Sequence, residues 1–267
     1  MVAQVLCIGV SDSSAGTGIQ ADIKTIQAFG AYAATVISAV SVQNTMNVYD
    51  IFAIPPEVVR HQLQAVMDDL KPTVIKTGML GDENVINIVG DLLDTLKSQN
   101  SHVVIDPVMT SRVGKVLLDK AARDALKRRL IIYADVLTPN LREAQDLTGL
   151  AITDVEGMKH AAEMLQTLGA DTVVVKGGGL SSEKLYNVLA DENGTEVYEM
   201  PRLDTRATHG AGTTLSAGIA AGLAMGLTPR AAFEAAQDFL TAAIASAEII
   251  GAGYGPVNHN HSRKAVS

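Results

Sequence analysis

The chain has 267 residues, of which 47% are hydrophobic and 19% are charged. This length and composition allow a large buried core, which excludes global disorder and fits one large α/β domain or two small ones. The formal net charge of -8, with acidic and basic residues interspersed, argues against a general nucleic-acid-binding protein.

The single cysteine, Cys7, lies in the apolar run VLCIGV and is interpreted as a buried strand residue. It has no intrachain disulfide partner, which is typical of a reducing compartment and predicts a cytoplasmic protein. The N-terminus lacks the basic and apolar regions of a signal peptide, and no window approaches ~18 uninterrupted apolar residues. We therefore expect no membrane-spanning helix and no membrane partner.

Strand and helix patterns alternate along the chain. The first half predicts, in order, a strand over 3–10, a helix ending near Phe29, strands over 34–42 and 48–53, and a helix over 55–70. A strand with its turn (73–80), a helix (82–98), a strand (102–109), a helix (116–129) and a strand (134–140) follow. The second half predicts a strand over 171–179, a hairpin of 186–191 and 195–201, a helix from about Thr213, and a helix from about Arg230 to Ile249.

This pattern gives about eight strands alternating with helices, and no change in composition marks a linker. It predicts a single α/β domain over residues 1–267, in which helices cover both faces of a mostly parallel sheet. Beyond about residue 257 we expect a loose tail, with His259 and His261 exposed to solvent.

Side chains capable of phosphate chemistry follow several predicted strands: Asp106, Asn140 with Glu143, and Lys176. Open α/β sheets bind ligands at the carboxyl ends of their strands, so we expect these groups to meet at one edge. Each has a plainer explanation alone, since Asp106 could cap a helix, Glu143 could face solvent and Lys176 could be a surface amine. Together they suit phosphoryl transfer, in which carboxylates hold Mg²⁺ and a lysine meets the phosphates.

The stretch HGAGTT, residues 209–214, precedes a run of small apolar residues. Gly210 and Gly212 permit a tight turn and a close approach to a ligand, and the apolar run predicts a buried helix. A glycine-rich turn leading into a helix N-terminus presents free N–H groups to an anion such as phosphate. An ordinary turn before a core helix explains this stretch equally well.

Several motifs occur in a fixed order from residue 11 to 257: SDSSAGTGIQADIKTIQAFGAY, VQNT, KTGML, DPVM, LTPNLREA, VVVKGG, THGAGTTLSAGIAAGLA and GPV. With them, the chain resembles the hydroxymethylpyrimidine/phosphomethylpyrimidine kinases of thiamine biosynthesis, which belong to the ribokinase-like superfamily. The resemblance implies a ribokinase-like three-layer αβα sandwich with a mostly parallel central sheet. It also implies a homodimeric transferase that uses ATP and Mg²⁺, with room for a monovalent cation. Its substrates would be 4-amino-5-hydroxymethyl-2-methylpyrimidine and the monophosphate of this pyrimidine.

The resemblance also assigns roles to individual residues. On the substrate side, it implies that Asp22 binds the pyrimidine amino group, that Gln43 bonds a ring nitrogen, and that Met79 and Val108 pack near the ring. Without it, Asp22 would be interpreted as an exposed helix position and Met79 as core filling. A carboxylate beside a carboxamide suits the donors and acceptors along one edge of an aminopyrimidine.

On the phosphate side, the resemblance implies that Asp106 and Glu143 support Mg²⁺ and that Asn140 and Lys176 reach the ATP phosphates. The catalytic anion hole would be the turn formed by Gly210, Ala211, Gly212 and Thr213.

Four positions depart from the family pattern. Thr213 stands where the family has cysteine and wider relatives have aspartate, the residue assigned as the base. A threonine hydroxyl is not a base near neutral pH, and base assistance contributes ~10²–10⁴-fold. Because phosphoryl transfer depends mainly on positioning and charge stabilisation, we expect a slow kinase and not an inactive one. Arg112 replaces a lysine, Gly179 a histidine and Asn187 an aspartate, and the last two are expected on the nucleotide side.

Two alternative functions remain open at this stage. A pyridoxal, pyridoxine or pyridoxamine kinase would also phosphorylate a hydroxymethyl group on a small ring, although Asp22 with Gln43 favours the aminopyrimidine. A weakly catalytic pyrimidine-binding protein is the second alternative, and Thr213 motivates it.

Overall fold

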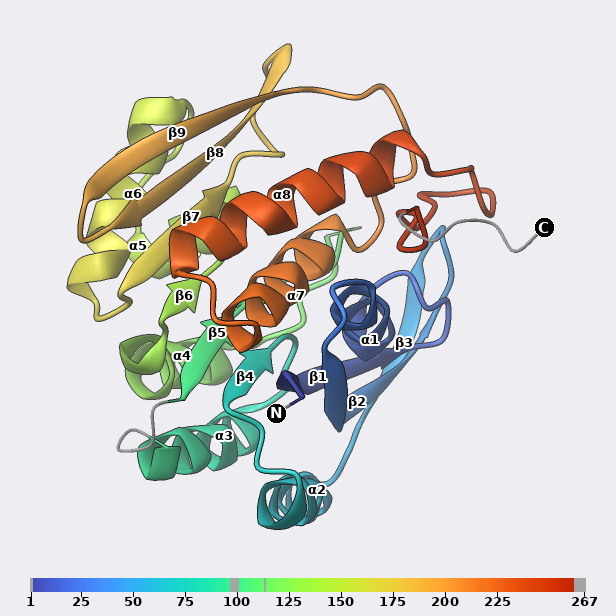
Figure 1. Ribbon diagram of the computed structural model, residues 1–267, viewed down its shortest axis with the longest axis vertical. Coiled ribbons are helices and arrows are strands. Elements are labelled where there is room, and N and C mark those ends of the chain that lie inside the picture. Colours follow the sequence, from blue (N-terminus) through green and yellow to red (C-terminus); the bar gives the residue numbers. More distant parts are fainter. Residues whose placement is uncertain (1, 97–100, 113, 262–267) are drawn as a thin grey trace.

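The computed structural model describes residues 2–96, 101–112 and 114–261. Its strands form one sheet of nine, in the order β3-β2-β1-β4-β5-β6-β7-β8-β9 (Figure 1). The strands are β1 (Gln4–Asp12), β2 (Tyr32–Gln43), β3 (Val48–Ala53), β4 (Val74–Thr77), β5 (His102–Ile105), β6 (Val136–Leu137), β7 (Thr172–Lys176), β8 (Lys184–Asp191) and β9 (Gly194–Pro201). The pairings from β2 to β7 are parallel, and β3, β8 and β9 are antiparallel to their neighbours. The predicted mostly parallel sheet is confirmed.

Helices cover both faces of this sheet, as Figure 1 shows. One face carries α1 (Gly18–Ala28), α7 (Ala211–Ala224) and α8 (Pro229–Ala245). The other carries α2 (Pro56–Asp69), α3 (Glu83–Leu96), α4 (Lys120–Arg129), the 3-10 turn η1 (Ile131–Tyr133), α5 (Leu141–Thr148) and α6 (Val155–Thr167). Each face has its own buried apolar cluster, so the core consists of two layers separated by the strands. This is the three-layer αβα sandwich predicted from the sequence.

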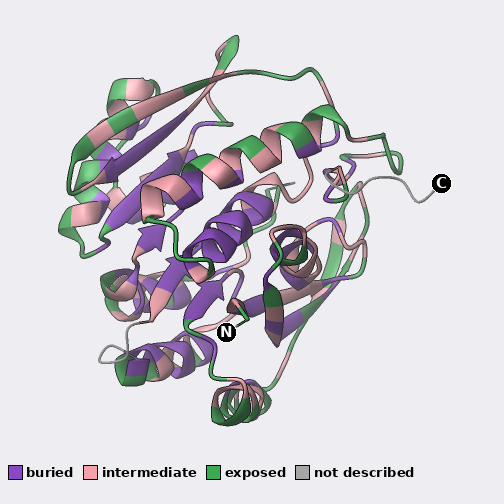
Figure 2. Cartoon of the chain, viewed as in Figure 1, coloured by how far each residue is buried: buried purple, intermediate pink, exposed green. Residues whose placement is uncertain are grey.

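Helix α7 is buried on almost all sides, whereas α8 exposes one face (Figure 2). Small residues make this burial possible, because a Cβ added at Gly218 or Gly222 would lie 2.8 Å from the Cβ of Ala236 or Ala232 in α8. The helix begins at Ala211, two residues before the predicted start at Thr213. The reason is Gly210, whose φ of 79° turns the chain directly into the first helical turn.

Helices α5 and α6 lie in a stretch for which the sequence patterns predicted no element. Asn140 and Asp154 cap their N-termini, and Asn140 forms a reciprocal capping box with Glu143. The spacing of Asn140 and Glu143 was therefore the sequence signal that could have predicted the start of α5. The other predicted elements are present with shifted ends, and the predicted end of the third helix at 97–98 lies outside the described residues.

The prediction of a loose, solvated tail is wrong for residues 258–261. The His259 side chain is buried, and its Nε2 lies 3.0 Å from the hydroxyl of Thr214 in α7. Asn258 binds the carbonyl of Ala243 in α8, so this segment packs against the two C-terminal helices. Residues 262–267 lie outside the described part of the chain. Within that part, no helix has the length and apolar character needed to cross a membrane.

Candidate active site

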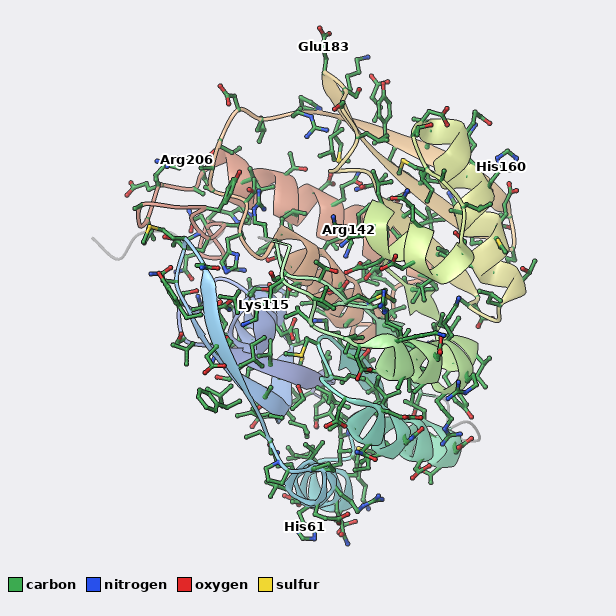
Figure 3. The ribbon with its side chains drawn as sticks, turned by 180° about the vertical axis from the view of Figure 1, so that it is seen from behind. His61, Lys115, Arg142, His160, Glu183 and Arg206 are labelled. Carbon is green, nitrogen blue, oxygen red and sulfur yellow. The ribbon has the colours of Figure 1, made fainter. Side chains whose placement is uncertain are left out.

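A cavity of about 1530 Å³ opens at the carboxyl ends of the parallel strands. Strands β1 and β4 are neighbours, but the chain continues from them toward opposite edges of the sheet, and α/β proteins bind ligands at such a switch point. Every site residue predicted from the sequence lines this cavity: Asp22, Gln43, Met79, Asp106, Val108, Asn140, Glu143, Lys176, Gly210, Ala211, Gly212 and Thr213. Figure 3 shows the loop between β7 and β8, with Glu183 at its outer tip; Glu183 also lines the cavity.

Asp22, Gln43, Met79 and Val108 line the cavity, and we call them the ring end because the resemblance assigns them to the substrate ring. Asp22 is not at an exposed helix position, because α1 turns it inward to Lys76 of β4. The Lys76 Nζ lies 2.8 Å from the Asp22 Oδ1, and each side chain is 1% exposed. Met79 is buried, whereas Gln43 and Val108 are half-buried. Lys76 was not among the predicted site residues; its signal was a charge inside an otherwise apolar strand.

The Asp22–Lys76 pair is a buried ion pair. Burial raises the pKa of the Asp22 carboxyl, and the adjacent Lys76 ammonium opposes that rise. Burial alone would lower the pKa of Lys76, but the carboxylates of Asp22 and Asp106 outweigh it and raise this pKa. The lysine is therefore charged, and its charge favours the ionised form of Asp22.

The other end, the phosphate end, is built around Asp106 and Lys176. The Lys176 Nζ lies 2.8 Å from the Asp106 Oδ1, and the Ser216 hydroxyl lies 3.3 Å from Oδ2. The lysine side chain is 14% exposed, so a ligand in the cavity can reach it. A Cβ added at Gly212 would lie 3.2 Å from the Lys176 Nζ, which places the ammonium against the first turn of α7.

Glu143 is not on a solvated face, because the cap of α5 buries it. Its Oε2 accepts the Asn140 N–H at 2.8 Å, and its own N–H donates to the Asn140 Oδ1 at 3.0 Å. Burial, with a smaller contribution from Asp106, raises the pKa of Glu143 to about 7 although Lys176 lowers it. The cap uses the oxygen of Asn140, and no hydrogen bond within the described ranges uses its Nδ2. That amide group therefore has donors for a phosphate.

The carboxylates at the phosphate end fit a hard divalent cation. Among the residues described, no group of three or more His, Cys, Asp or Glu forms a complete metal site. Asp106 and Glu143 supply two buried carboxylates that interact electrostatically. Proteins usually hold Mg²⁺ with one or two carboxylates, together with substrate phosphates and water. The pair therefore fits an Mg²⁺ ion that binds with a nucleotide.

The turn before α7 offers free backbone donors. Within the described part of the chain, the N–H groups of Gly210, Gly212 and Thr213 make no hydrogen bond, whereas that of Ala211 contacts the Thr208 carbonyl at 3.3 Å. Unpaired N–H groups in a first helical turn attract anions. Gly210, Gly212 and Thr213 therefore offer unpaired N–H groups to the predicted anion hole, whereas Ala211 is partly engaged.

A second turn, residues 12–17, packs against the anion hole. A Cβ at Gly210 would lie 1.8 Å from the Gly16 carbonyl oxygen, and a Cβ at Gly16 would lie 2.2 Å from the His209 ring. The hydroxyls of Thr17 and Thr213 are hydrogen bonded at 2.8 Å. The two turns can pack this closely only because Gly16 and Gly210 have no side chains. Each turn therefore fixes the position of the other.

Asp12 organises the second turn. Its carboxylate accepts hydrogen bonds from the backbone N–H groups of Ser14, Gly16 and Thr17, and its Oδ2 lies 3.5 Å from the His209 Nε2. Burial favours a higher pKa, but these contacts outweigh it and hold the pKa of Asp12 well below its usual range. Asp12 and Thr17 were absent from the predicted site, because the sequence does not show which turns meet.

A model of the phosphomethylpyrimidine kinase family matches residues 12–258, a range that includes every predicted site residue. The chain belongs to the phosphomethylpyrimidine kinase family. The hydroxymethylpyrimidine/phosphomethylpyrimidine kinase of Haemophilus influenzae is 43% identical over 262 residues, which is 97% of each chain.

Solved structures confirm the ribokinase-like fold. The pyridoxal kinase of Staphylococcus aureus in complex with AMP-PCP and pyridoxal has a TM-score of 0.91 and 33% identity, covering 99% of this chain and 96% of that one. The phosphomethylpyrimidine kinase of Clostridium difficile has a TM-score of 0.78 and 35% identity, covering 90% of this chain and 98% of that one.

The four departures from the family pattern all line the cavity. Thr213 is described above. Arg112 donates to the Thr208 carbonyl at 2.9 Å, and its guanidinium carbon lies 4.0 Å from the centre of the Tyr254 ring. Asn187 is buried, and its side chain bonds Gln237 at 3.0 Å. Gly179 lies in the loop after β7. Arg112 thus binds the residue just before the anion-hole turn. The Asn187 Oδ1 accepts the Gly177 N–H at the start of the loop between β7 and β8.

Proposed function

We propose that this member of the phosphomethylpyrimidine kinase family transfers the γ-phosphoryl group of ATP to 4-amino-5-hydroxymethyl-2-methylpyrimidine and then to the resulting monophosphate, as in thiamine biosynthesis. One observation carries the proposal: a carboxylate–carboxamide ring end and a lysine–carboxylate phosphate end share one cavity. A substrate with an aminopyrimidine ring and a primary alcohol needs both ends.

At the ring end, Asp22 accepts an N–H of the amino group and the Gln43 carboxamide bonds a ring nitrogen. Met79 and Val108 pack near the ring and limit its movement. These contacts direct the hydroxymethyl group toward the anion-hole turn. Binding of this kind lowers the entropic cost of bringing the alcohol to the phosphorus.

At the phosphate end, Lys176 and the Asn140 amide bind the nucleotide phosphates, and Asp106 and Glu143 hold Mg²⁺. The metal, when bound, neutralises charge on the phosphates. The N–H groups of Gly212 and Thr213 donate to the transferring phosphoryl group. The substrate oxygen forms a bond to the γ-phosphorus as the bond to ADP breaks, and the alcohol proton passes to solvent water because position 213 has no ionisable side chain to accept it. The proposed rate is therefore low for a kinase of this family.

A pyridoxal-type vitamer is the second candidate substrate. The similarity to the pyridoxal kinase of S. aureus supports it, because that structure contains pyridoxal. The Asp22 carboxyl group, which pairs with Lys76, favours a ring that presents an amino donor, so the aminopyrimidine is the leading substrate.

A coupled ADP-release assay tests the proposal. The enzyme is supplied with ATP, Mg²⁺ and either the aminopyrimidine or pyridoxal, and a reaction without acceptor measures background ATP hydrolysis. We expect a higher kcat/KM for the aminopyrimidine. If the enzyme phosphorylated pyridoxal and not the aminopyrimidine, pyridoxal would become the leading candidate substrate. Calorimetric binding without turnover of either compound would identify a weakly catalytic binding protein.

We further propose a homodimer of single-domain kinase chains in the cytoplasm. The hairpin β2–β3 supports a dimer, since it exposes several large apolar side chains: Val40, Val42, Met46, Tyr49 and Phe52. The free buried Cys7 is consistent with a reducing compartment. Light scattering of the purified protein tests the dimer, and a mass of one chain would exclude it.

A further inference from the structure

Lys76 is one of the largest fully buried side chains of the protein, and the proposed reaction does not use it. Removing a lysine and an aspartate from water costs several kcal/mol per ion, and an apolar pair of similar size often stabilises a fold as well or better. Fold stability alone is therefore a weak reason for a charged pair here. Both residues line the cavity, so the pair is placed to act on a bound ligand.

The geometry of the pair leaves one carboxylate oxygen for a ligand. Lys76 donates to the Asp22 Oδ1 at 2.8 Å, and within the described residues no hydrogen bond uses Oδ2. An ammonium that binds one oxygen restricts rotation of the carboxylate, because turning the group would break a buried ion pair. The second oxygen is then held in place as an acceptor before any substrate arrives.

The surroundings make the charge of Asp22 depend on Lys76. The ionisable groups that act on it are Lys76, Asp106 and Cys7. The Cys7 thiol is neutral because burial raises its pKa well above the ordinary value. Asp106 carries the same sign as Asp22 and so disfavours its ionised form, which leaves Lys76 as the group of opposite charge that supports it.

We propose that Lys76 is a specificity-determining positioning residue that holds Asp22 as a carboxylate with Oδ2 ready to accept the exocyclic amino group of the substrate. This inference rests on the proposed function and extends it to a residue that does not touch the substrate. Without Lys76, the carboxyl takes up a proton and loses its fixed acceptor. The ring end then no longer distinguishes an amino group from hydrogen at that ring position.

A comparison of two substrates measures this distinction. The first is 4-amino-5-hydroxymethyl-2-methylpyrimidine, and the second is the same molecule without the amino group. The ratio of their kcat/KM values reports the contact with Asp22. Because charge-assisted hydrogen bonds are about twice as strong as neutral ones, we expect Lys76→Met to lower the ratio roughly tenfold or more, mainly through KM.

Two further variants separate positioning from folding. Asp22→Asn is expected to lower the ratio as Lys76→Met does. The double variant Lys76→Met/Asp22→Asn contains no buried charge at this place, so it is expected to recover thermal stability and not discrimination. Lys184→Met, at an exposed lysine of β8 that pairs with Glu199, is the matched control and should keep the wild-type ratio.

Two results would overturn the inference: a wild-type ratio in Lys76→Met, or a ratio restored along with stability in the double variant. Failure of the proposed function looks different, because the wild-type enzyme would then not turn over the aminopyrimidine. In that case, the ratio of the two dissociation constants from calorimetry decides the inference by the same criteria.

Discussion

Two lysine–aspartate pairs lie in the cavity, and their bonds have the same length. Nζ and Oδ1 are 2.8 Å apart both in Lys76–Asp22 and in Lys176–Asp106. Their surroundings differ, because both members of the first pair are 1% exposed whereas Lys176 is 14% exposed. Asp106 also has hydroxyl partners in Thr138 and Ser216, whereas Asp22 has none among the residues that the structure describes.

This difference determines which pair can open. Breaking Lys76–Asp22 would leave two buried charges unpaired, which costs about 3–5 kcal/mol in comparable cases. In the proposed reaction Lys176 turns to a phosphate, so its charge keeps an anionic partner, while Asp106 keeps its hydroxyl donors and would bind Mg²⁺. Access and alternative partners, and not bond length, thus separate a permanent ion pair from an exchangeable one. The predictions below test this distinction, from the largest expected effect to the smallest.

The largest effect is expected from Lys176→Gln, which removes the exchangeable ammonium. Loss of a preorganised group that stabilises transition-state charge typically lowers kcat about 10²–10³-fold. Initial-rate kinetics with saturating ATP and substrate measure it. Lys184→Gln, which removes an exposed lysine of β8, should leave kcat unchanged. A higher KM for ATP with an unchanged kcat would contradict this prediction. It would show that Lys176 stabilises bound ATP and the transition state of phosphoryl transfer equally.

Thr213→Cys is expected to raise kcat by up to ~10²-fold, which is the lower end of base assistance. A thiol beside Lys176 and the N-terminus of α7 ionises more readily than a free one, so it can take the substrate proton. Thr213→Ser keeps the hydroxyl and should behave as the wild type. Equal rates for all three enzymes would mean that proton removal does not limit turnover.

Gln43→Ala tests the ring end without disturbing its ion pair. Loss of one hydrogen bond to the pyrimidine should raise KM about tenfold, with kcat changed only a few-fold. Gln64→Ala, at an exposed position of α2, is the control for a glutamine away from the cavity. A large fall in kcat with unchanged KM would place Gln43 at the phosphate end and contradict the division of the cavity.

The smallest effect on catalysis is expected from His259→Asn. This variant tests a buried ionisable side chain that, unlike Lys76, has no opposite charge among the groups that shift its pKa. Burial, with smaller contributions from Lys24 and His261, lowers the pKa of His259 from 6.5 to about 4. The unfolded chain therefore binds more protons between these values, and stability is lost as the pH falls through this range, by at most roughly 3 kcal/mol. Thermal denaturation from pH 7 to pH 4 should show a shallower fall in Tm for the variant. His61→Asn, an exposed histidine of α2 labelled in Figure 3, should keep the wild-type slope.

The fold could be predicted because it follows from local patterns, whereas Asp22, Gln43, Met79 and Val108 were assigned only through the resemblance to a kinase family. Alternation of strands and helices implies a parallel sheet, and a parallel sheet brings the residues after β5, β6 and β7 to one edge. Asp106, Asn140 and Lys176 therefore line one cavity, as expected. The roles of these residues stay predictions until the experiments are made.

Pairings between distant residues could not be predicted in this way. Lys76 and Asp22 are 54 positions apart, and their contact depends on how α1 packs over the junction of β1 and β4. The contact of Asp12 with His209 depends on two turns that meet only in the folded chain. Helix α5 was missed because it has only eight residues, too few for a clear helical period, and the capping box of Asn140 and Glu143 marks its start.

The contact between Gly16 and Gly210 has a consequence for how the protein acquires activity. Thr17 and Thr213, beside these glycines, are 196 positions apart, so the two turns join only when both ends of the chain are in place. Closing such a long loop is entropically costly and comes late on folding pathways. A nascent chain on the ribosome therefore cannot join the two turns until Thr213 has been synthesised. In a refolding experiment, recovered kinase activity should lag behind recovered helix content.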